Sequence, residues 1–113
     1  MDYEKIKAEI LDFVDKRDWK QFHNPKDLAT AICIESSELE ELFLRKSQEE
    51  SYEIGKNNPK VREEFADIFN YLVMFAEECE IDIEKEVLAK LGKNKKKYPV
   101  EKARWKSDKY TEL

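Results

Sequence analysis

The sequence predicts an all-α fold, and two observations lead there: its composition and its periodicity. Only 2 of its 113 residues are Gly and 3 are Pro, the residue types that interrupt helices most strongly. Charged residues make up 42% and hydrophobic ones 41%, and apolar positions recur every three to four residues, as along one face of a helix. Regularly placed apolar residues indicate packed helices rather than the disorder that high charge alone would suggest. We therefore expect a four-helix protomer.

The first two predicted helices are joined by a short connector. We expect the first over about residues 2–17, where four apolar residues share one face: Ile6, Ile10, Phe13 and Val14. The second covers about residues 26–46, because Asn24 suits an N-cap and Pro25 suits the first turn of a helix.

The second half of the chain holds two further predicted helices. Residues 47–57 are polar and contain a Gly, which predicts a loop. The third helix follows over about residues 59–80, with Asn58 as its N-cap. The fourth covers about residues 82–96, and Asp82 suits its N-cap.

Length, charge and hydropathy limit the partners of the chain. One domain over residues 1–100, followed by a polar tail over residues 101–113, fits the length. A net charge of −5 argues against a polymeric nucleic acid partner. No apolar run approaches the ~20 residues of a transmembrane helix, and the charged start is unlike a signal peptide, so we expect no membrane partner and a cytoplasmic location.

Cys33 and Cys79 are too few for a disulfide framework and are expected to be reduced core residues.

Four carboxylates interrupt the apolar faces of the second and third predicted helices: Glu35, Glu38, Glu64 and Asp67. The apolar face of the third helix consists of Val61, Phe65, Ile68, Leu72 and Phe75. Burying an unpaired ionised carboxylate costs on the order of several kcal/mol, and no Lys or Arg recurs at matching spacings. A divalent metal ion is the simplest partner. Oxygen ligands without Cys or His favour Mg²⁺, with Mn²⁺ as a substitute.

Mg²⁺ usually completes its coordination shell with substrate phosphates, so phosphoryl or nucleotidyl transfer is the expected chemistry. Two alternatives stay open. The carboxylates can instead form solvated faces or interhelical salt bridges, as in a non-enzymatic helical protein-interaction module. A di-iron bundle usually needs Glu-x-x-His motifs on two helices, but the single histidine, His23, lies in a connector.

Four blocks of the sequence carry a family resemblance. They are residues 17–23 (RDWKQFH), residues 34–43 around Glu35-x-x-Glu38, residues 63–72 around Glu64-x-x-Asp67, and the run Lys90-x-x-x-Asn94-x-x-x-Tyr98-Pro99. In this order they resemble the MazG-like nucleoside triphosphate pyrophosphohydrolases, most closely the dCTP pyrophosphatase branch. The resemblance covers roughly residues 3–100, and it implies the all-α MazG-like bundle.

The resemblance also implies a reaction. The family hydrolyses the bond between the α- and β-phosphates of (deoxy)nucleoside triphosphates, which gives the monophosphate and pyrophosphate and clears unwanted nucleotides from the pool. By this resemblance Glu35, Glu38, Glu64 and Asp67 are the Mg²⁺ ligands and the catalytic residues. Glu41, one turn beyond Glu38, either orients the attacking water or is a surface charge.

Substrate contacts are implied in the same way. Lys90, Asn94 and Tyr98 recur every four residues, so they share one helix face, and all three can donate hydrogen bonds to a triphosphate. An aromatic ring before the second helix can stack on a base. The full set of implied substrate-binding residues is Trp19, His23, Arg45, Asn70, Lys90, Asn94, Lys97 and Tyr98.

Two departures from the family pattern concern the base. Leu44 and Arg45 stand where the branch commonly has Gln-Trp, and Ile10 stands where some relatives carry a His. Both positions bear on base identity and leave the metal chemistry intact. Cytosine nucleotides are the expected substrates because the resemblance is closest to that branch.

A protomer of this size cannot easily enclose a nucleotide by itself. Apolar residues on several sides of the third helix indicate a contact with another subunit: Phe69, Tyr71, Val73 and Met74. Relatives in the family are dimers or dimers of dimers, and we expect a homo-oligomer here as well.

Overall fold

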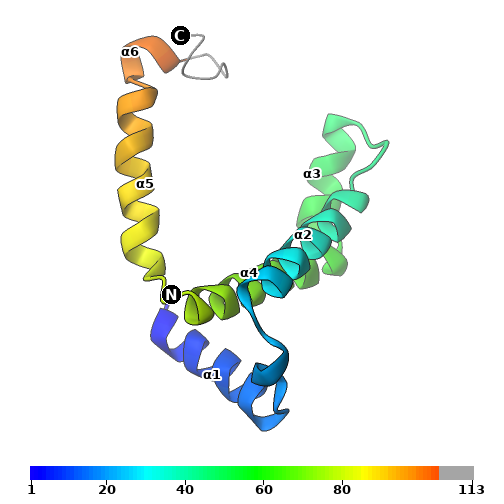
Figure 1. The fold of residues 1–113 in the computed structure, drawn as a ribbon. Helices are drawn as coiled ribbons and strands as arrows, with labels where there is room; N and C mark the ends of the chain where they lie inside the picture. The colour runs from blue at the N-terminus through cyan, green and yellow to red at the C-terminus, as the bar shows by residue number, and fades with distance from the viewer. Residues whose placement is uncertain (105–113) are drawn as a thin grey trace. The chain divides into compact units, whose positions relative to one another are not determined.

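The computed structural model describes residues 1–104, and over these residues the chain is helical and contains no strand (Figure 1). This confirms the predicted all-α fold. The elements in chain order are α1 (Tyr3–Lys16), the 3₁₀ helix η1 (Trp19–Phe22), α2 (Pro25–Glu41), α3 (Gln48–Asn57), α4 (Pro59–Glu78), α5 (Ile83–Lys97) and α6 (Val100–Ala103).

The helix starts follow the predicted caps. The side chain of Asn24 accepts a hydrogen bond from the backbone N–H of Asp27 at 2.9 Å. Asn58 and Asp82 do the same at the starts of α4 and α5. Each of these caps satisfies a backbone donor that the first turn leaves without an intrahelical partner. The cap assignments made from the sequence are therefore confirmed.

The predicted loop over residues 47–57 is wrong, because most of this segment forms α3. Ser47 and Glu50 make a capping box: the Ser47 hydroxyl accepts from the Glu50 N–H at 3.1 Å, and the Ser47 N–H donates to Glu50 Oε1 at 3.2 Å. The second helix is correspondingly shorter than predicted. It ends at Glu41, and Arg45 takes a left-handed backbone conformation with φ of 62°.

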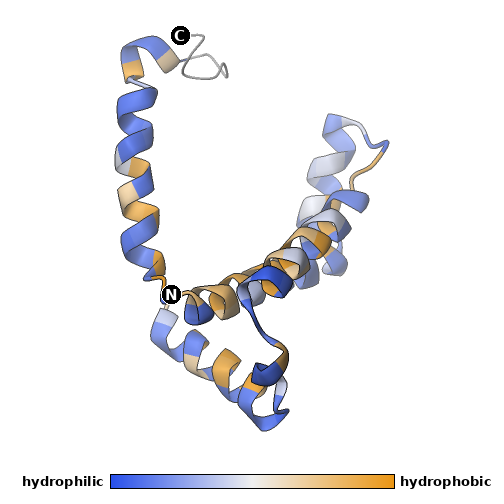
Figure 2. Ribbon diagram, in the orientation of Figure 1, coloured by the Kyte–Doolittle hydropathy of each residue, from blue (hydrophilic) through white to orange (hydrophobic). Residues whose placement is uncertain are grey.

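The chain divides into two compact units, Met1–Glu80 and Ile81–Leu113. In the first unit α2 packs along α4, and α1 packs on the C-terminal half of α4, where Lys7 Nζ lies 3.5 Å from Glu77 Oε2. The core of this unit consists of Ile10, Val14, Leu28, Val73, Met74 and Ala76. Figure 2 shows apolar residues along the faces where these helices meet.

Some burial expectations need correction. Phe13 and Phe65, predicted on core-facing stripes, are 43% and 67% exposed, because they lie outside the packed core between α1, α2 and α4. Val73 and Met74, predicted at a subunit contact, are buried inside the protomer instead. Cys33 is exposed rather than buried.

The second unit contains α5 and the short α6. Val100–Ala103 form one helical turn, so the start of the predicted polar tail is structured, and residues 105–113 of that tail lie outside the described residues. The domain boundary at residue 100 remains a prediction. Among the described helices, none combines the length and hydropathy needed to cross a membrane.

Candidate functional site

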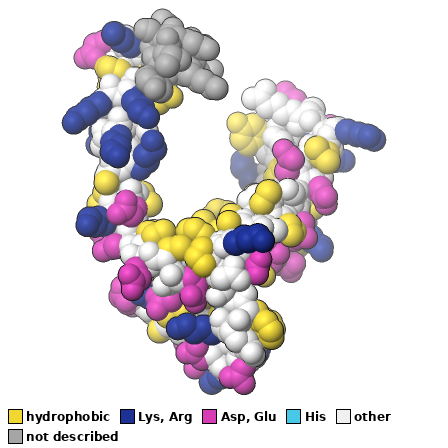
Figure 3. All heavy atoms as spheres, in the orientation of Figure 1, with side chains coloured by type: hydrophobic (Ala, Val, Ile, Leu, Met, Phe, Trp, Pro, Cys, Tyr) yellow, Lys and Arg dark blue, Asp and Glu magenta, His cyan; other side chains and the backbone are white. Residues whose placement is uncertain are grey.

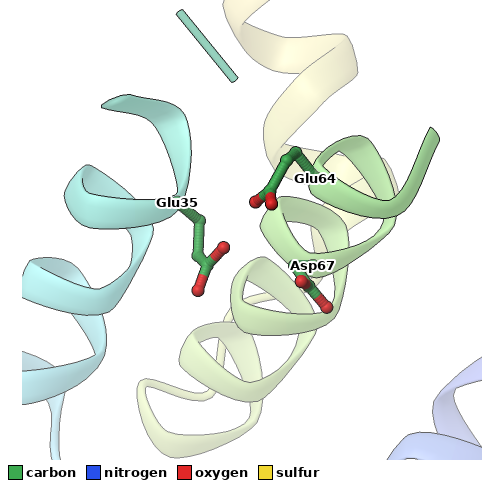
Figure 4. Close-up of side chains that lie close together, drawn as sticks. All are labelled: Glu35, Glu64 and Asp67. Atoms are coloured by element: carbon green, nitrogen blue, oxygen red, sulfur yellow. The ribbon is translucent and has the colours of Figure 1, made fainter. Parts of the chain in front are cut away.

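Three of the four predicted carboxylates come together between α2 and α4. Glu35, Glu64 and Asp67 each offer one oxygen atom, and these three atoms lie within 4.8 Å of one another. Figure 4 shows Glu35 reaching from α2 toward Glu64 and Asp67 on α4. The spacing of three residues places Glu64 and Asp67 on one face of α4, and the packing of α2 along α4 supplies Glu35. We call these residues the carboxylate triad.

The carboxylate triad contains buried oxygen atoms without partners. Oε2 of Glu35 and Oε2 of Glu64 are buried, and neither accepts a hydrogen bond within the described part of the chain. Over the same residues the ion pairs are Lys7–Glu77 and Lys16–Asp12, so no lysine or arginine neutralises the triad. Buried polar atoms are almost always satisfied, and these two atoms are therefore oriented for a ligand that supplies positive charge.

The electrostatics of the site show how closely the charges are crowded. The pKa of Glu35 is raised from 4.5 to about 7. Burial is the largest cause, followed by the neighbouring carboxyl group of Glu64 and then by the negative charges of Glu38 and Asp67. Glu38 is exposed and lies outside the triad, but its charge acts on Glu35 and so it borders the site.

Tyr71 is a site residue that sequence reasoning placed elsewhere. Its pKa is raised by burial and by the charges of Glu35, Asp67 and Glu38, so its phenol lies in the field of the same carboxylates. Because Tyr71 follows Asp67 by four residues on α4, helical spacing could have identified it. The apolar neighbours of Tyr71 in the sequence instead predicted a subunit contact for it.

The donor set fits a hard divalent cation. All three triad ligands are carboxylate oxygens, and the described residues contribute no His or Cys to the group. Oxygen ligands of this kind suit Mg²⁺, Ca²⁺ or Mn²⁺, whereas zinc and copper favour nitrogen and sulfur. The unpartnered oxygens of Glu35 and Glu64 independently favour a positively charged ligand at this position.

The raised pKa of Glu35 predicts a pH-dependent stability of the metal-free protein. A carboxyl group with a raised pKa in the folded state favours folding when protonated, so its contribution is present below pH 4.5 and is lost as the pH rises toward 7. Glu35→Gln removes this dependence. In EDTA the variant is expected to have the same free energy of unfolding as the wild type near pH 4. Above pH 7 its free energy of unfolding should be higher by about 1 kcal/mol, which is less than the full pKa shift would give because solvent screens a partly exposed group.

Urea unfolding at several pH values measures this difference, and Glu40→Gln, an exposed change on the same helix, is the matched control. A difference between wild type and Glu35→Gln that stays constant from about pH 4 to about pH 8 would contradict the assigned crowding.

The predicted base-contacting residues lie around η1. Trp19 is 42% exposed and makes an edge-to-face contact with Phe13, with ring centroids 5.4 Å apart. His23 is half-buried at the C-cap of η1, where its backbone N–H donates to the carbonyl of Lys20 at 3.0 Å. The contacts described for these residues lie within α1 and η1, and the structure does not place them against the carboxylate triad.

The remaining predicted residues of the first unit lie on or just beyond α2 and α4. Glu41 is the last residue of α2 and is exposed, and Arg45 is exposed in the turn that follows. Asn70 is half-buried on α4, three residues after Asp67. Their roles stay predictions.

Four predicted phosphate-contacting residues belong to the second unit. Lys90, Asn94 and Lys97 lie on α5, and Tyr98 is its C-cap residue, with its backbone N–H donating to the carbonyl of Asn94 at 2.9 Å. The predicted helical spacing is confirmed, because Lys90 and Asn94 fall within one continuous helix. Their contact with a nucleotide stays a prediction.

Comparisons with known proteins bear on the whole chain. A sequence model of the MazG-like family matches residues 30–113, a span that includes all four predicted carboxylates. dCTP pyrophosphatase 1 of Homo sapiens is 39% identical over 97% of this chain and 66% of its own length, and that of Bos taurus is 38% identical over 97% and 67%. The chain thus spans about two thirds of the length of these curated relatives.

A solved structure agrees with this result. The crystal structure of a pyrophosphatase from Archaeoglobus fulgidus superposes with a TM-score of 0.82 at 36% identity, over 88% of this chain and 94% of that one. The helical architecture is therefore shared with a pyrophosphatase, and the family model matches the part of the chain that holds the carboxylate triad. The chain belongs to the MazG-like family.

Proposed function

We propose that this protein hydrolyses (deoxy)nucleoside triphosphates between the α- and β-phosphates, releasing the monophosphate and pyrophosphate, and that it clears unwanted nucleotides from the pool. The observation that carries the proposal is the carboxylate triad, with two buried oxygens that lack partners, in a MazG-like chain. The similarity to dCTP pyrophosphatases supports the reaction class.

Glu35, Glu64 and Asp67 would hold the metal ion, with Glu38 as a further ligand at the edge of the site. Mg²⁺ is the proposed ion, and Mn²⁺ would substitute for it. When bound, such an ion polarises phosphate oxygens and lowers the pKa of a coordinated water. The residues of the chain contribute a fixed, negatively charged cradle between two packed helices, which would hold the ion in one place and so align the triphosphate bound to it. Glu41 is a further candidate for orienting that water.

The substrate side of the site is proposed from residues outside the carboxylate triad. Trp19 and His23 would contact the base, and Asn70 and Arg45 would contact the nucleotide from α4 and from the turn after α2. Lys90, Asn94, Lys97 and Tyr98 would contact the phosphates, because ammonium, amide and phenol groups donate hydrogen bonds to phosphate oxygens. The proposed base is cytosine.

A homo-oligomer, a dimer or a dimer of dimers, is part of the proposal. The first unit exposes Ile34 on α2 and Phe65 and Leu72 on α4, at 52%, 67% and 43%. Figure 3 shows apolar side chains gathered on the surface over these two helices. Apolar surface of this kind suits a subunit contact, and sedimentation velocity of the full chain tests it.

The function is tested by assaying a panel of standard and modified nucleoside triphosphates with Mg²⁺. We expect hydrolysis with cytosine deoxynucleotides as the preferred substrates, because the chain is similar to dCTP pyrophosphatases. Release of monophosphate and pyrophosphate from any member of the panel supports the enzyme. No hydrolysis across the whole panel would favour the competing class, a non-enzymatic helical interaction module.

A further inference from the structure

Three side chains at the end of α1 form a stack that the carboxylate triad does not explain. Trp19 contacts Phe13 with an interplanar angle of 81°, and the guanidinium carbon of Arg17 lies 3.9 Å from the centroid of the Phe13 ring. We call these residues the Phe13 stack. Its two interactions, an edge-to-face aromatic pair and a cation–π contact, are both directional.

The backbone brings the stack together. Helix α1 ends at Lys16, and Asp18 adopts the left-handed conformation with φ of 54° and ψ of 32°, which few residues other than Gly adopt. This turn brings Trp19 back beside Phe13, six residues earlier in the chain. Gln21 Nε2 also donates to the carbonyl of Asp18 at 2.9 Å, which links the turn to η1.

Arg17 is fixed at two points. Its Nη1 donates to the backbone carbonyl of Phe13 at 3.1 Å, an oxygen left without an intrahelical partner at the end of α1. The same guanidinium lies over the Phe13 ring. A planar guanidinium can do both at once, whereas a lysine ammonium offers only a point charge.

The stack is ordered but not buried. Phe13 and Trp19 are 43% and 42% exposed, so core packing alone does not account for three interlocked side chains here. An indole with a fixed orientation and an open surface can accept a stacked nucleobase, because every base presents a π-face. Because the indole is already held in one orientation, binding a base causes a smaller loss of side-chain conformational entropy.

We propose that Phe13 and Arg17 are positioning residues that hold the Trp19 indole in one orientation for stacking on the base of the nucleotide. This inference rests on the proposed function, because it takes Trp19 as the base-contacting residue. It assigns the stacking of the base to a three-residue unit at the end of α1 and the start of η1, separate from the carboxylates that carry the metal chemistry.

The test uses two variants and one matched control in the full chain. Phe13→Leu removes the ring but keeps apolar bulk, and Arg17→Lys keeps the charge but removes the planar fork. Phe22→Leu is the control, since Phe22 is another exposed aromatic residue of the connector, 64% exposed, without a ring contact in the described residues. Substrates are dCTP and its base-free analogue, 2-deoxyribose 5-triphosphate.

We expect both variants to raise KM for dCTP by about 3- to 10-fold, the range that the loss of one aromatic pair or one cation–π contact converts to. We expect kcat to stay within about 2-fold of wild type, and hydrolysis of the base-free analogue to be unchanged, because neither involves the base. In a Trp105→Phe background, quenching of Trp19 fluorescence by dCMP should weaken by the same factor, without any need for hydrolysis.

Other outcomes decide the matter as well. Unchanged KM and quenching in both variants would overturn the inference, as would an equal rise in KM for the base-free analogue, which indicates a merely structural role. If Phe13→Leu does not fold, Arg17→Lys alone decides. If wild-type protein hydrolyses no triphosphate but dCMP quenching still depends on Phe13, the proposed function fails and the positioning role stands.

Discussion

Replacing Glu64 by Gln is expected to lower kcat/KM for nucleoside triphosphates by about 10³-fold or more. The change is isosteric, so it keeps the packing of α4 on α2, but it removes one negative charge and one strong oxygen ligand from the carboxylate triad. The buried Oε2 of Glu64 accepts no hydrogen bond from the described residues, which is why we propose the metal ion as its partner.

The adjacent change Glu63→Gln is the control, since Glu63 is exposed on α4 and outside the triad. It should leave kcat/KM within about 2-fold of wild type. A Glu64→Gln variant that retains a tenth or more of the wild-type value would remove the triad from the mechanism. Glu38→Gln is also expected to abolish hydrolysis, if Glu38 completes the coordination of the ion as proposed.

Adding Mg²⁺ to the metal-free protein is expected to raise its melting temperature by roughly 10 °C. A ligand present at 100 times its Kd stabilises the folded state by about 2.7 kcal/mol, and for a chain of this size each kcal/mol raises the midpoint by roughly 3 to 6 °C. Relief of repulsion within the triad is the physical source of the gain, because the cation neutralises carboxylates that crowd one another.

The measurement is a thermal melt of the EDTA-treated protein with increasing Mg²⁺, at about pH 8, where Glu35 is ionised and ready to bind. Glu64→Gln provides the comparison, and its midpoint should move by less than about 2 °C. An equal shift in the wild type and in this variant would show that Mg²⁺ acts elsewhere on a protein of net charge −5.

Local signals in the sequence predicted much of the fold. Asn24, Asn58 and Asp82 were identified as caps because each makes its hydrogen bond within three residues. The capping box that starts α3 was just as local, with Ser47 and Glu50 in the expected spacing. The polar composition of the segment and its glycine are typical of a loop, and they mask this cap signature.

Burial was harder to predict, because it depends on which faces other helices cover. Helical periodicity placed Phe65 on an apolar stripe of α4, but it did not show that the first unit leaves this residue 67% exposed. Conversely, Val73 was assigned to a subunit contact and is instead covered within the protomer. An apolar stripe on a helix indicates that this face makes an apolar contact. Whether the contact lies inside the protomer or between subunits depends on which helix packs against it.

The sequence predicted three of the four carboxylates of the site in their observed grouping. Spacing of three residues on α4 brought Glu64 and Asp67 together as expected, and Glu35 joined them from α2. Glu38 lies three residues from Glu35, which rotates it about 60° around the helix axis, and it is exposed at the border of the site. Sequence periodicity gives the face of a helix but not this finer difference.

The most direct test of the account is the identity of the products that the wild-type protein forms from dCTP. Phosphorus-31 NMR of the reaction with Mg²⁺ should show dCMP and pyrophosphate in equal amounts, with no products in EDTA and none from Glu64→Gln. Formation of dCDP and orthophosphate, or product formation that persists without a divalent ion, would contradict the proposed cleavage at the carboxylate triad.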